Sequence, residues 1–260
     1  MNIIGIIPAR LASSRFPNKP LAKILGMPMI GHVFHRSKLC KDLSEVYIAT
    51  CDTEIKDYIE SIGGKAILTS DKHERASDRT AEALLKIEKE INERIDIVVM
   101  IQGDEPMVAP EMISESVKPL LEDKTILISN LMANIETRED HEDPNEVKVV
   151  VDKNNFALYF SREPIPSRRK GVENVLMLKQ VCVIPFRRDF LLEYNKMPQT
   201  PLEKIESVDM NRILENGLKV KMIMVEINTY SVDTPADLEF AEEAMKSDLM
   251  IKRYMNDLVV

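Results

Sequence analysis

The chain begins MNIIGIIPARLASSRFPNKPLAKILG (residues 1–26), and this stretch decides how the rest of the sequence is interpreted. The run Ile3–Ile7 is apolar almost without interruption, as expected of a central parallel strand that is buried on both faces. It ends at Pro8, and no glycine follows before Gly26. Three cations lie between Pro8 and Pro20: Arg10, Arg15 and Lys19. A basic loop after a buried first strand is typical of phosphate binding, although the usual glycine-rich phosphate loop is missing.

Strand-like and helix-like segments alternate over the first hundred residues. The predicted strands are residues 3–7, 45–50, 65–70 and 96–103, and the predicted helices are residues 28–39, 53–64 and 78–92. This alternation favours a parallel α/β sheet with right-handed crossovers. Ligands of such sheets bind at the carboxyl ends of the strands, so a site is expected in the loops after Ile7, Thr50, Ser70 and Ile101.

The pattern changes at about residue 125, where strand-like segments become more frequent than helices. We expect a single domain whose core is residues 1–124 and 203–260, with a smaller β-rich sub-domain inserted at residues 125–202. Within it, residues 147–160 indicate a hairpin with Asn154 and Asn155 at the turn. Edge hairpins of this kind often pair with a second copy, so a homodimer is expected.

Composition limits the class of protein. The chain has 260 residues, 44% of them hydrophobic and 30% charged, and a net charge of −8. A net-acidic chain is a poor candidate for nucleic-acid binding, which needs concentrated positive charge. No apolar run approaches the ~20 residues of a membrane span, and the N-terminus lacks the features of a signal peptide. Three scattered cysteines without a CxxC pair suit buried thiols in a reducing cytoplasm: Cys40, Cys51 and Cys182.

Two aspartates follow strand-like segments and are candidates for metal binding. Asp104 lies in QGDEP (102–106), directly after an apolar strand, where a carboxylate can bind a divalent cation together with substrate phosphates. Asp233 precedes Thr234, a natural helix N-cap. Asp104 could instead be a turn-forming residue, and Asp233 a solvated residue at a helix entry. Together with the basic loop, however, two carboxylates at strand exits favour a metal and phosphate site.

The basic loop 8–20 has the means to hold an anion without glycines. Prolines stiffen it and restrict where its cations point, and the serines Ser13 and Ser14 add hydroxyls and an anion-binding backbone. Arginine matches phosphate oxygens bidentately, while lysine supplies a compact charge. The alternative is a solvated basic turn.

The stretch DKHERASDRTAEA (71–83) is a further candidate at a strand exit. Ser77 could cap the helix that follows. Arg79 would then lie in the first turn, where the helix dipole disfavours a cation, so a ligand anion is the better reason for it.

Several catalytic motifs are absent. His32 and His35 are three residues apart without a third ligand nearby, which favours a surface or core role over metal binding. HExxH, GxSxG, GxxxxGK[ST] and GxGxxG do not occur, which argues against a P-loop NTPase and a dinucleotide-dependent dehydrogenase.

Taken together, these segments resemble the CMP-Kdo synthetases (3-deoxy-manno-octulosonate cytidylyltransferases). The resemblance runs in order through IIPARLASSRFPNKPLAKILGMPMI, IATCDTEI, LTSDKHERASDRTAE, VVMIQGDEPMV, DPNEVKVVVD, ALYFSREPIPSRR, TPLEKIESVDMNRILENG and SVDTPADL, and covers almost the whole chain. PAR-x₄-R-x-P-x-K-P combined with QGDEP and VDTP is a specific set.

The resemblance implies a fold, a reaction and a set of site residues. The fold would be a Rossmann-like α/β nucleotidyltransferase with a mixed, mostly parallel sheet flanked by helices, in a cytoplasmic homodimer. The reaction would be Mg²⁺-dependent transfer of CMP from CTP to the anomeric hydroxyl of a 2-keto-3-deoxy sugar acid. The residues that would bind the nucleotide are Pro8, Ala9, Arg10, Ser14, Arg15, Lys19, Ser77, Arg79, Gln102 and Gly103. Asp104 and Asp233 would hold Mg²⁺ and, with Arg10 and Lys19, be catalytic.

The chain departs from the family pattern at three segments. One is residues 73–79, HERASDR, where the family has HxSGTDR, and the other two would meet the sugar acid. The residues assigned to that site are Arg162, Gln180, Ile184, Asp209 and Met210. Gln180 and Ile184 stand where the family has His and Tyr, and SVDMNR (207–212) replaces SLEQLR. Because losing polar contacts changes which analogue a site accepts, we expect a modified or related ulosonate as substrate. The alternatives are a cytidylyltransferase for a sialic- or legionaminic-type acid and a non-catalytic nucleotide- or sugar-binding homologue.

Overall fold

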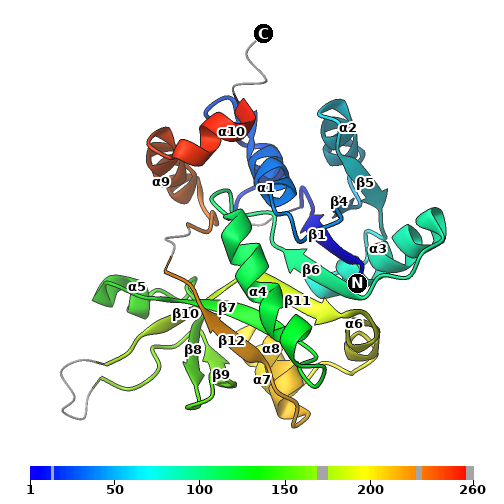
Figure 1. Ribbon diagram of the computed structural model, residues 1–260. Coiled ribbons are helices and arrows are strands. Elements are labelled where there is room, and N and C mark those ends of the chain that lie inside the picture. The colour runs from blue at the N-terminus through cyan, green and yellow to red at the C-terminus, as the bar shows by residue number, and fades with distance from the viewer. Residues whose placement is uncertain (13–14, 169–174, 227–229, 256–260) are drawn as a thin grey trace. The chain divides into compact units, whose positions relative to one another are not determined.

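The structure is a computed structural model and describes residues 1–12, 15–168, 175–226 and 230–255 (Figure 1). The chain divides into two compact units. The first unit consists of Met1–Ser114 and Thr229–Val260, and the second unit of Glu115–Asn228. The two units are described separately.

The first unit is built on parallel strands, as the sequence predicts. Its strands β6 (Ile97–Ile101), β1 (Ile3–Ala9), β4 (Glu45–Thr50) and β5 (Lys65–Leu68) are neighbours in that order, and every pairing among them is parallel. All seven residues of β1 are buried, which explains its continuous apolar sequence. A two-stranded ribbon follows the basic loop, β2 (Lys23–Ile24) with β3 (Met27–Pro28). The prediction of an α/β fold with a mostly parallel sheet is therefore confirmed.

Helices connect these strands at the predicted places. The connecting helices are α1 (Met29–Lys38), α2 (Thr53–Ser61) and α3 (Ala76–Ile91). The unit also contains η1 (Lys19–Leu21), α9 (Pro235–Lys246), η2 (Leu249–Ile251) and α10 (Lys252–Met255), and α4 (Pro110–Glu122) begins in it. After α2, Gly63 takes a φ of +76°, a backbone conformation that glycine adopts without strain. The helices α1, α2 and α3 therefore supply the crossovers that parallel strands require.

The second unit has a mixed sheet. Its strand order is β12 (Lys221–Met224), β7 (Ser129–Asn134), β10 (Leu178–Val181), β8 (Lys148–Val151) and β9 (Ala157–Ser161). The pair β12–β7 is parallel and the other pairings are antiparallel. The predicted hairpin is confirmed as β8–β9, with Asn155 at a φ of +57° in the turn. The remaining elements are β11 (Val183–Arg187), α5 (Arg138–Glu142), α6 (Arg188–Tyr194), α7 (Pro201–Glu206) and α8 (Met210–Glu215).

The unit boundaries differ from those expected for the core and the inserted sub-domain. Residues 115–124 and 203–228 belong to the second unit rather than to the first. The cause is long-range packing within that unit: β12 pairs with β7 along four residues, and Asn211 of α8 bonds the backbone of Phe160 on β9. The expected role of this unit in sugar binding and dimerisation stays a prediction.

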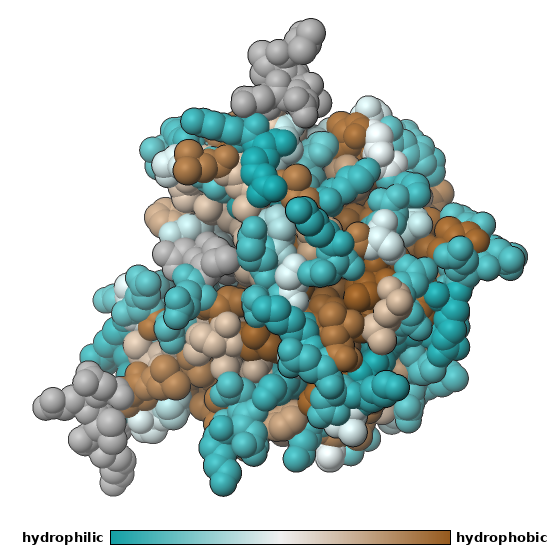
Figure 2. All heavy atoms as spheres, in the orientation of Figure 1, coloured by the Kyte–Doolittle hydropathy of each residue, from teal (hydrophilic) through white to brown (hydrophobic). Residues whose placement is uncertain are grey.

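The visible face is largely hydrophilic, with hydrophobic side chains scattered among the polar ones (Figure 2). Exposed apolar side chains such as Leu158 and Phe240 are ordinary for a folded chain. Within the described residues, no helix combines the length and the apolar character needed to cross a bilayer.

Candidate active site

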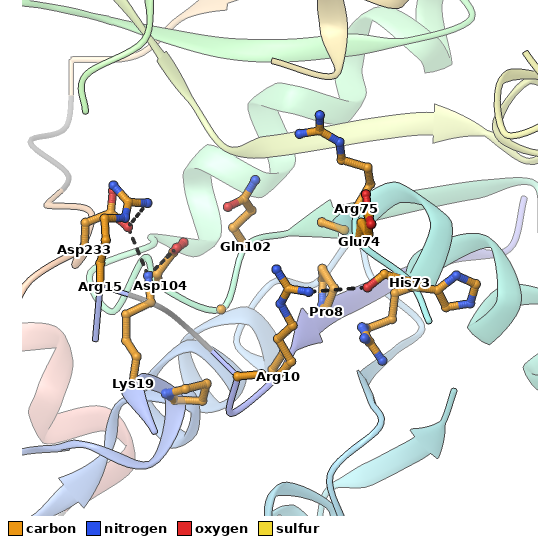
Figure 3. Close-up of a pocket in the computed structure, with 16 residues that line it drawn as sticks. Pro8, Arg10, Arg15, Lys19, His73, Glu74, Arg75, Gln102, Asp104 and Asp233 are labelled. Carbon is orange, nitrogen blue, oxygen red and sulfur yellow. Dashed lines mark hydrogen bonds and ion pairs between the residues drawn. The ribbon is translucent and has the colours of Figure 1, made fainter. Parts of the chain in front are cut away.

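A pocket of about 320 Å³ lies where β1 and β6 end in the first unit (Figure 3). Most of the residues predicted to bind nucleotide or metal line it: Pro8, Ala9, Arg10, Arg15, Lys19, Arg79, Gln102, Gly103, Asp104 and Asp233. Further lining residues that the prediction left out are Ala12, Pro20, His73, Glu74, Arg75 and Ala76. Of the predicted nucleotide residues, Ser77 is buried and does not line the pocket, and Ser14 lies outside the described residues.

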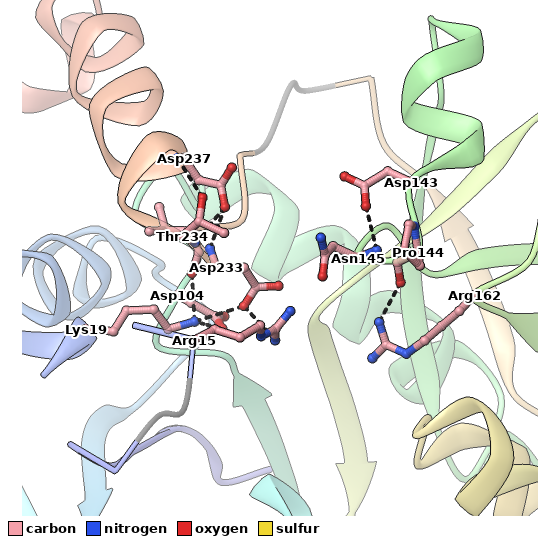
Figure 4. Close-up of polar contacts among 11 residues, drawn as sticks. Arg15, Lys19, Asp104, Asp143, Pro144, Asn145, Arg162, Asp233, Thr234 and Asp237 are labelled. Carbon is pink, nitrogen blue, oxygen red and sulfur yellow. Dashed lines mark hydrogen bonds and ion pairs between the residues drawn. The ribbon is translucent and has the colours of Figure 1, made fainter. Parts of the chain in front are cut away.

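An ion cluster forms one side of this pocket (Figure 4). The ammonium of Lys19 donates to Asp104 Oδ2 at 2.9 Å, to Asp233 Oδ1 at 3.2 Å and to the carbonyl of Val232 at 2.7 Å. Arg15 Nη2 also donates to Asp233 Oδ1, at 3.0 Å. Burial alone would lower the pKa of Lys19, but the two carboxylates outweigh it and raise that pKa above its ordinary value of 10.5. Lys19 therefore keeps its positive charge at neutral pH.

Local structure explains why Asp233 is free to join the cluster. Thr234 is the N-cap of α9 and accepts from the N–H of Asp237. Asp237 in return accepts from the N–H groups of Asp233 and Thr234, at 2.9 and 2.7 Å. Because this capping box satisfies the helix entry, the carboxylate of Asp233 is not needed as a cap and points to Lys19 and Arg15.

The loop that carries Asp104 is held close to β1 and to the Asp233 segment. A side chain at Gly103 would come within 3.0 Å of Ile30 Cδ1 and 3.3 Å of the Pro8 carbonyl, so glycine permits this close approach. The N–H of Val232 donates to the carbonyl of Asp104 at 2.9 Å. The two aspartates, 129 residues apart in sequence, are thus tied through their backbones as well as through Lys19.

The start of the basic loop is anchored by a residue that sequence reasoning missed. Asp52 follows β4 and accepts from the N–H of Leu11 at 2.7 Å. Arg10 is exposed and donates from Nη1 to the carbonyl of His73 at 3.5 Å. The only available signal for Asp52 was its place after Thr50, in one of the loops expected to carry the site.

Arg79 is buried in the first turn of α3 and has spare capacity to donate. Its Nη1 bonds Thr69 Oγ1 at 2.5 Å and the carbonyl of Ser70 at 3.3 Å. Its Nη2 is buried and has no hydrogen-bond partner among the described residues. An arginine that lines a pocket with an unpartnered buried donor is suited to a polar ligand.

Ser77 does not cap α3, contrary to one interpretation of the sequence. The helix begins at Ala76, its N-cap is Arg75 in an extended conformation, and no side chain caps it. Alanine is the strongest helix former and extends the helix by one residue beyond the serine, which places Ser77 inside the first turn.

The residues assigned to the sugar acid all lie in the second unit. Arg162 donates from Nη1 to the Pro144 carbonyl and from Nε to the Glu206 carbonyl, both at 2.7 Å (Figure 4 shows the Pro144 contact). Ile184 and Met210 are buried, at 2% and 1% exposure, whereas Gln180 and Asp209 are partly exposed. Their assignment to a sugar site stays a prediction.

The carboxylates of Asp104 and Asp233 have the chemistry to hold a magnesium ion. Both accept from the same ammonium, so they converge on one cationic position, and each keeps about a fifth of its side chain exposed. Mg²⁺ is typically bound by one or two carboxylates and completes its shell with water and substrate phosphates. The described residues contain no group of three or more His, Cys, Asp or Glu side chains arranged for a metal.

The fold and the pocket together define a class of protein: a nucleotidyltransferase, with cations and carboxylates gathered where parallel strands end. Comparison with known proteins specifies it. The family described as cytidylyltransferase matches residues 4–223. The chain belongs to the cytidylyltransferase family and groups within it with the 3-deoxy-manno-octulosonate cytidylyltransferases.

Relatives and a solved structure support that membership. The 3-deoxy-manno-octulosonate cytidylyltransferase of Geotalea uraniireducens is 41% identical over 95% of this chain and 100% of its own length. The enzyme of the same name from Thermodesulfovibrio yellowstonii is 43% identical over 95% of this chain and 99% of its own. A structure of CMP:2-keto-3-deoxy-manno-octonic acid synthetase with CTP superposes with a TM-score of 0.87, at 36% identity, over 96% of this chain and 100% of that one. The predicted family and enzyme class are confirmed.

Proposed function

We propose that the protein transfers CMP from CTP to the anomeric hydroxyl of a 3-deoxy-2-ulosonic acid and releases pyrophosphate. The observation that carries this proposal is the convergence of Lys19, Asp104 and Asp233 in the pocket at the strand ends. The names of the relatives and the CTP in the similar structure support the choice of nucleotide and of Kdo (3-deoxy-manno-octulosonate) as the sugar class.

The basic loop would bind the triphosphate. Arg10, Arg15 and Lys19 all line the pocket, and their charges would neutralise the negative charge that builds on the departing pyrophosphate. Lys19 is the best placed of them, because its raised pKa fixes the charge and three acceptors fix its position. Asp52, through Leu11, would hold the loop in the shape that presents these cations.

Asp104 and Asp233 would hold Mg²⁺, which when bound supplies a Lewis acid that polarises the α-phosphate and lowers the pKa of the attacking hydroxyl. No general base from the chain is then required. Arg79 and Gln102 line the same pocket and would contact the cytosine and ribose. For Arg79 this assignment is supported by its buried, unpartnered Nη2.

The sugar acid would be contacted by Arg162, Gln180, Ile184, Asp209 and Met210. Because Gln180 and Ile184 replace a His and a Tyr of the family pattern, we propose that the substrate is Kdo or a modified or related ulosonate. A cytidylyltransferase for a sialic- or legionaminic-type acid is the second candidate. A homodimer in the cytoplasm stays part of this proposal.

A panel assay tests the proposal. Purified enzyme is given CTP, Mg²⁺ and one of several acids: Kdo, 8-amino-8-deoxy-Kdo, N-acetylneuraminic acid or legionaminic acid, and pyrophosphate release is followed. Release with an octulosonate and not with the nonulosonates is expected. Release with a nonulosonate alone would favour the second candidate. If no acid gives release, but CTP still binds by calorimetry, the protein is a nucleotide-binding homologue and the proposal is wrong.

A further inference from the structure

Arg36, on α1, is a buried arginine whose guanidinium joins two chain segments that lead from the ion cluster. Its side chain is only 3% exposed. Nε donates to the carbonyl of Val108 at 2.8 Å, Nη2 to the carbonyl of Met107 at 3.1 Å, and Nη1 to Asp248 Oδ2 at 2.6 Å. A buried charge is tolerated when it is paired and hydrogen-bonded, and the planar fork of arginine suits three acceptors in fixed directions.

The two segments held by Arg36 are those that bring the two aspartates together. Met107 and Val108 lie three and four residues after Asp104, in the loop between β6 and α4. Asp248 lies two residues after the end of α9, the helix that begins two residues after Asp233. The Arg36 side chain therefore holds both the loop that follows Asp104 and the segment that follows α9.

Packed side chains also join these segments to the residue before Asp233. A hydrophobic core cluster contains Val232 and Met245 together with Met29 of α1, and Met107 packs against it. On the same helix, His32 bonds the hydroxyl of Tyr254 at 2.9 Å and the carbonyl of Ile24 at 2.8 Å. Figure 1 shows α10, which carries Tyr254, against α1. A shift of either segment at Arg36 would thus be passed through close packing to the aspartates.

We propose that Arg36 is a positioning residue: it sets the spacing of Asp104 and Asp233, and with it the affinity of the site for a divalent cation. This inference rests on the proposed function, since it assigns those aspartates to the metal. Partners that orient metal ligands matter strongly, and their loss costs about 10- to 100-fold in metal affinity or activity.

A second arginine with the same chemistry offers a matched control. Arg187, in the second unit, donates from Nε to the carbonyl of Ile126 at 2.8 Å and from Nη2 to the carbonyls of Leu120 and Asp123 at 2.6 and 3.1 Å. Like Arg36 it bonds backbone carbonyls, but none of the residues that it bonds lines the pocket. Replacing it should disturb folding stability without touching the metal site.

The experiment compares Arg36→Lys with Arg187→Lys in the full chain. Lysine keeps the positive charge but cannot make the forked bonds. Mn²⁺ serves as the probe ion, and its binding is measured without CTP or sugar from the electron paramagnetic resonance signal of the free ion. Calorimetry with CTP in EDTA measures nucleotide binding without metal, circular dichroism gives the melting temperature, and pyrophosphate release gives kcat.

We expect Arg36→Lys to weaken Mn²⁺ binding and lower kcat about 10-fold or more, while metal-free CTP binding stays close to that of the wild type. Arg187→Lys should melt earlier but bind Mn²⁺ normally. If Arg36→Lys does not fold, Asp248→Asn, which spares the bonds to the Met107 and Val108 carbonyls, should give a smaller loss in the same direction.

Two results would overturn the proposal, and they are distinguishable. If the Arg36 and Asp248 variants bind Mn²⁺ as the wild type does and only melt earlier, Arg36 merely stabilises the fold and the proposed function stands. If the wild type binds no Mn²⁺ and Asp104→Asn leaves kcat unchanged, the assignment of the aspartates to metal fails along with the role of Arg36.

Discussion

A cluster of charges in the first unit and a charged pair in the second unit differ in exposure and in what their partners do. In the first unit, Lys19 contacts Asp104 and Asp233, whose side chains are 20% and 19% exposed within the pocket. In the second unit, Arg212 makes a forked contact with Glu203, from Nε at 2.7 Å and from Nη2 at 2.5 Å, with Glu203 fully buried. The first set of charges can exchange partners for a ligand, whereas the second is enclosed.

The enclosed pair serves the architecture of its unit. Glu203 belongs to the capping box of α7 and Arg212 to α8, and the guanidinium also lies 4.6 Å from the ring centroid of Tyr194. The open cluster instead gathers three segments distant in sequence at a pocket. Residues placed for function often do not give the most stable arrangement. Substitutions in the two places should therefore affect different properties.

The largest effect is expected for Glu203→Gln, which leaves the buried Arg212 without its ionic partner. Breaking a buried pair by removing one member costs about 3–5 kcal/mol, so the free energy of unfolding should fall by that amount. Urea titration followed by circular dichroism measures it, and kcat per folded molecule should stay near the wild-type value. The double variant Glu203→Leu with Arg212→Met should recover much of the loss, since an apolar pair removes both charges. A loss of less than 1 kcal/mol in the single variant would contradict this account.

Asp104→Asn is the matching test in the open cluster. Removing a carboxylate that would hold Mg²⁺ weakens the stabilisation of developing charge and should lower kcat/KM about 100- to 1,000-fold, or about 2.7–4 kcal/mol of transition-state stabilisation. The melting temperature should stay the same or rise, because Lys19 keeps Asp233 and the Val232 carbonyl as acceptors. Pyrophosphate release and circular dichroism measure the two effects. Asp57→Asn, at an exposed position of α2, is the control. Near-normal turnover of a folded Asp104→Asn protein would remove Asp104 from the mechanism.

The contrast between these two sites also marks what the sequence could predict. The strand Ile3–Ala9, the basic loop, Asp104 after β6 and Asp233 before α9 all carry local patterns, because burial on both faces and a helix cap leave signatures within a few residues. Parallel topology then brings separate strand exits together without further information. This is why Lys19, Asp104 and Asp233 could be grouped before any coordinates.

Residues whose role depends on distant partners could not be found in this way. Asp52 acts on Leu11, 41 positions away, and Arg36 on Asp248, 212 positions away. Neither has a periodicity or motif that marks it. The pairing of β12 with β7 has no local signature either, since it joins segments about 90 residues apart. Ser77 shows the opposite error, because a local capping signal was overruled by a helix that begins earlier.

Asp52→Ala tests whether the cations of the open cluster depend on the bond between Asp52 and the N–H of Leu11. The substitution leaves the N–H of Leu11 without its acceptor and frees the loop that carries Arg10 and Arg15. An unmade bond of this kind costs about 1–3 kcal/mol, so the KM for CTP should rise about 10-fold with a smaller change in kcat. Initial-rate kinetics at varied CTP measure this. Asp52→Asn keeps an oxygen acceptor and should recover most of the affinity. If both variants have the wild-type KM, the loop holds its shape without Asp52.

The smallest effect is expected at Glu82, whose carboxylate is more exposed than those of the enclosed pair and the open cluster. It is 26% exposed and bonds Lys86, the N–H of Ser70 and His73. Burial opposes ionisation, but these partners outweigh it and lower the pKa of Glu82 from 4.5 to about 2. The folded state thus binds this proton more weakly than the unfolded chain does. The stabilisation is complete above about pH 5 and is lost as the pH falls towards 2.

Comparison of the wild type with Glu82→Gln by thermal melting across this range checks that dependence. At pH 7 the variant should be less stable by about 1 kcal/mol or less, because partly exposed pairs contribute little. The difference should shrink steadily between pH 5 and pH 2 and be nearly gone at the lower end. A difference that stays constant with pH would mean that the contacts of Glu82 act through packing rather than charge. Glu82 would then differ from both the Lys19 cluster and the Arg212–Glu203 pair, because those depend on ionised carboxylates.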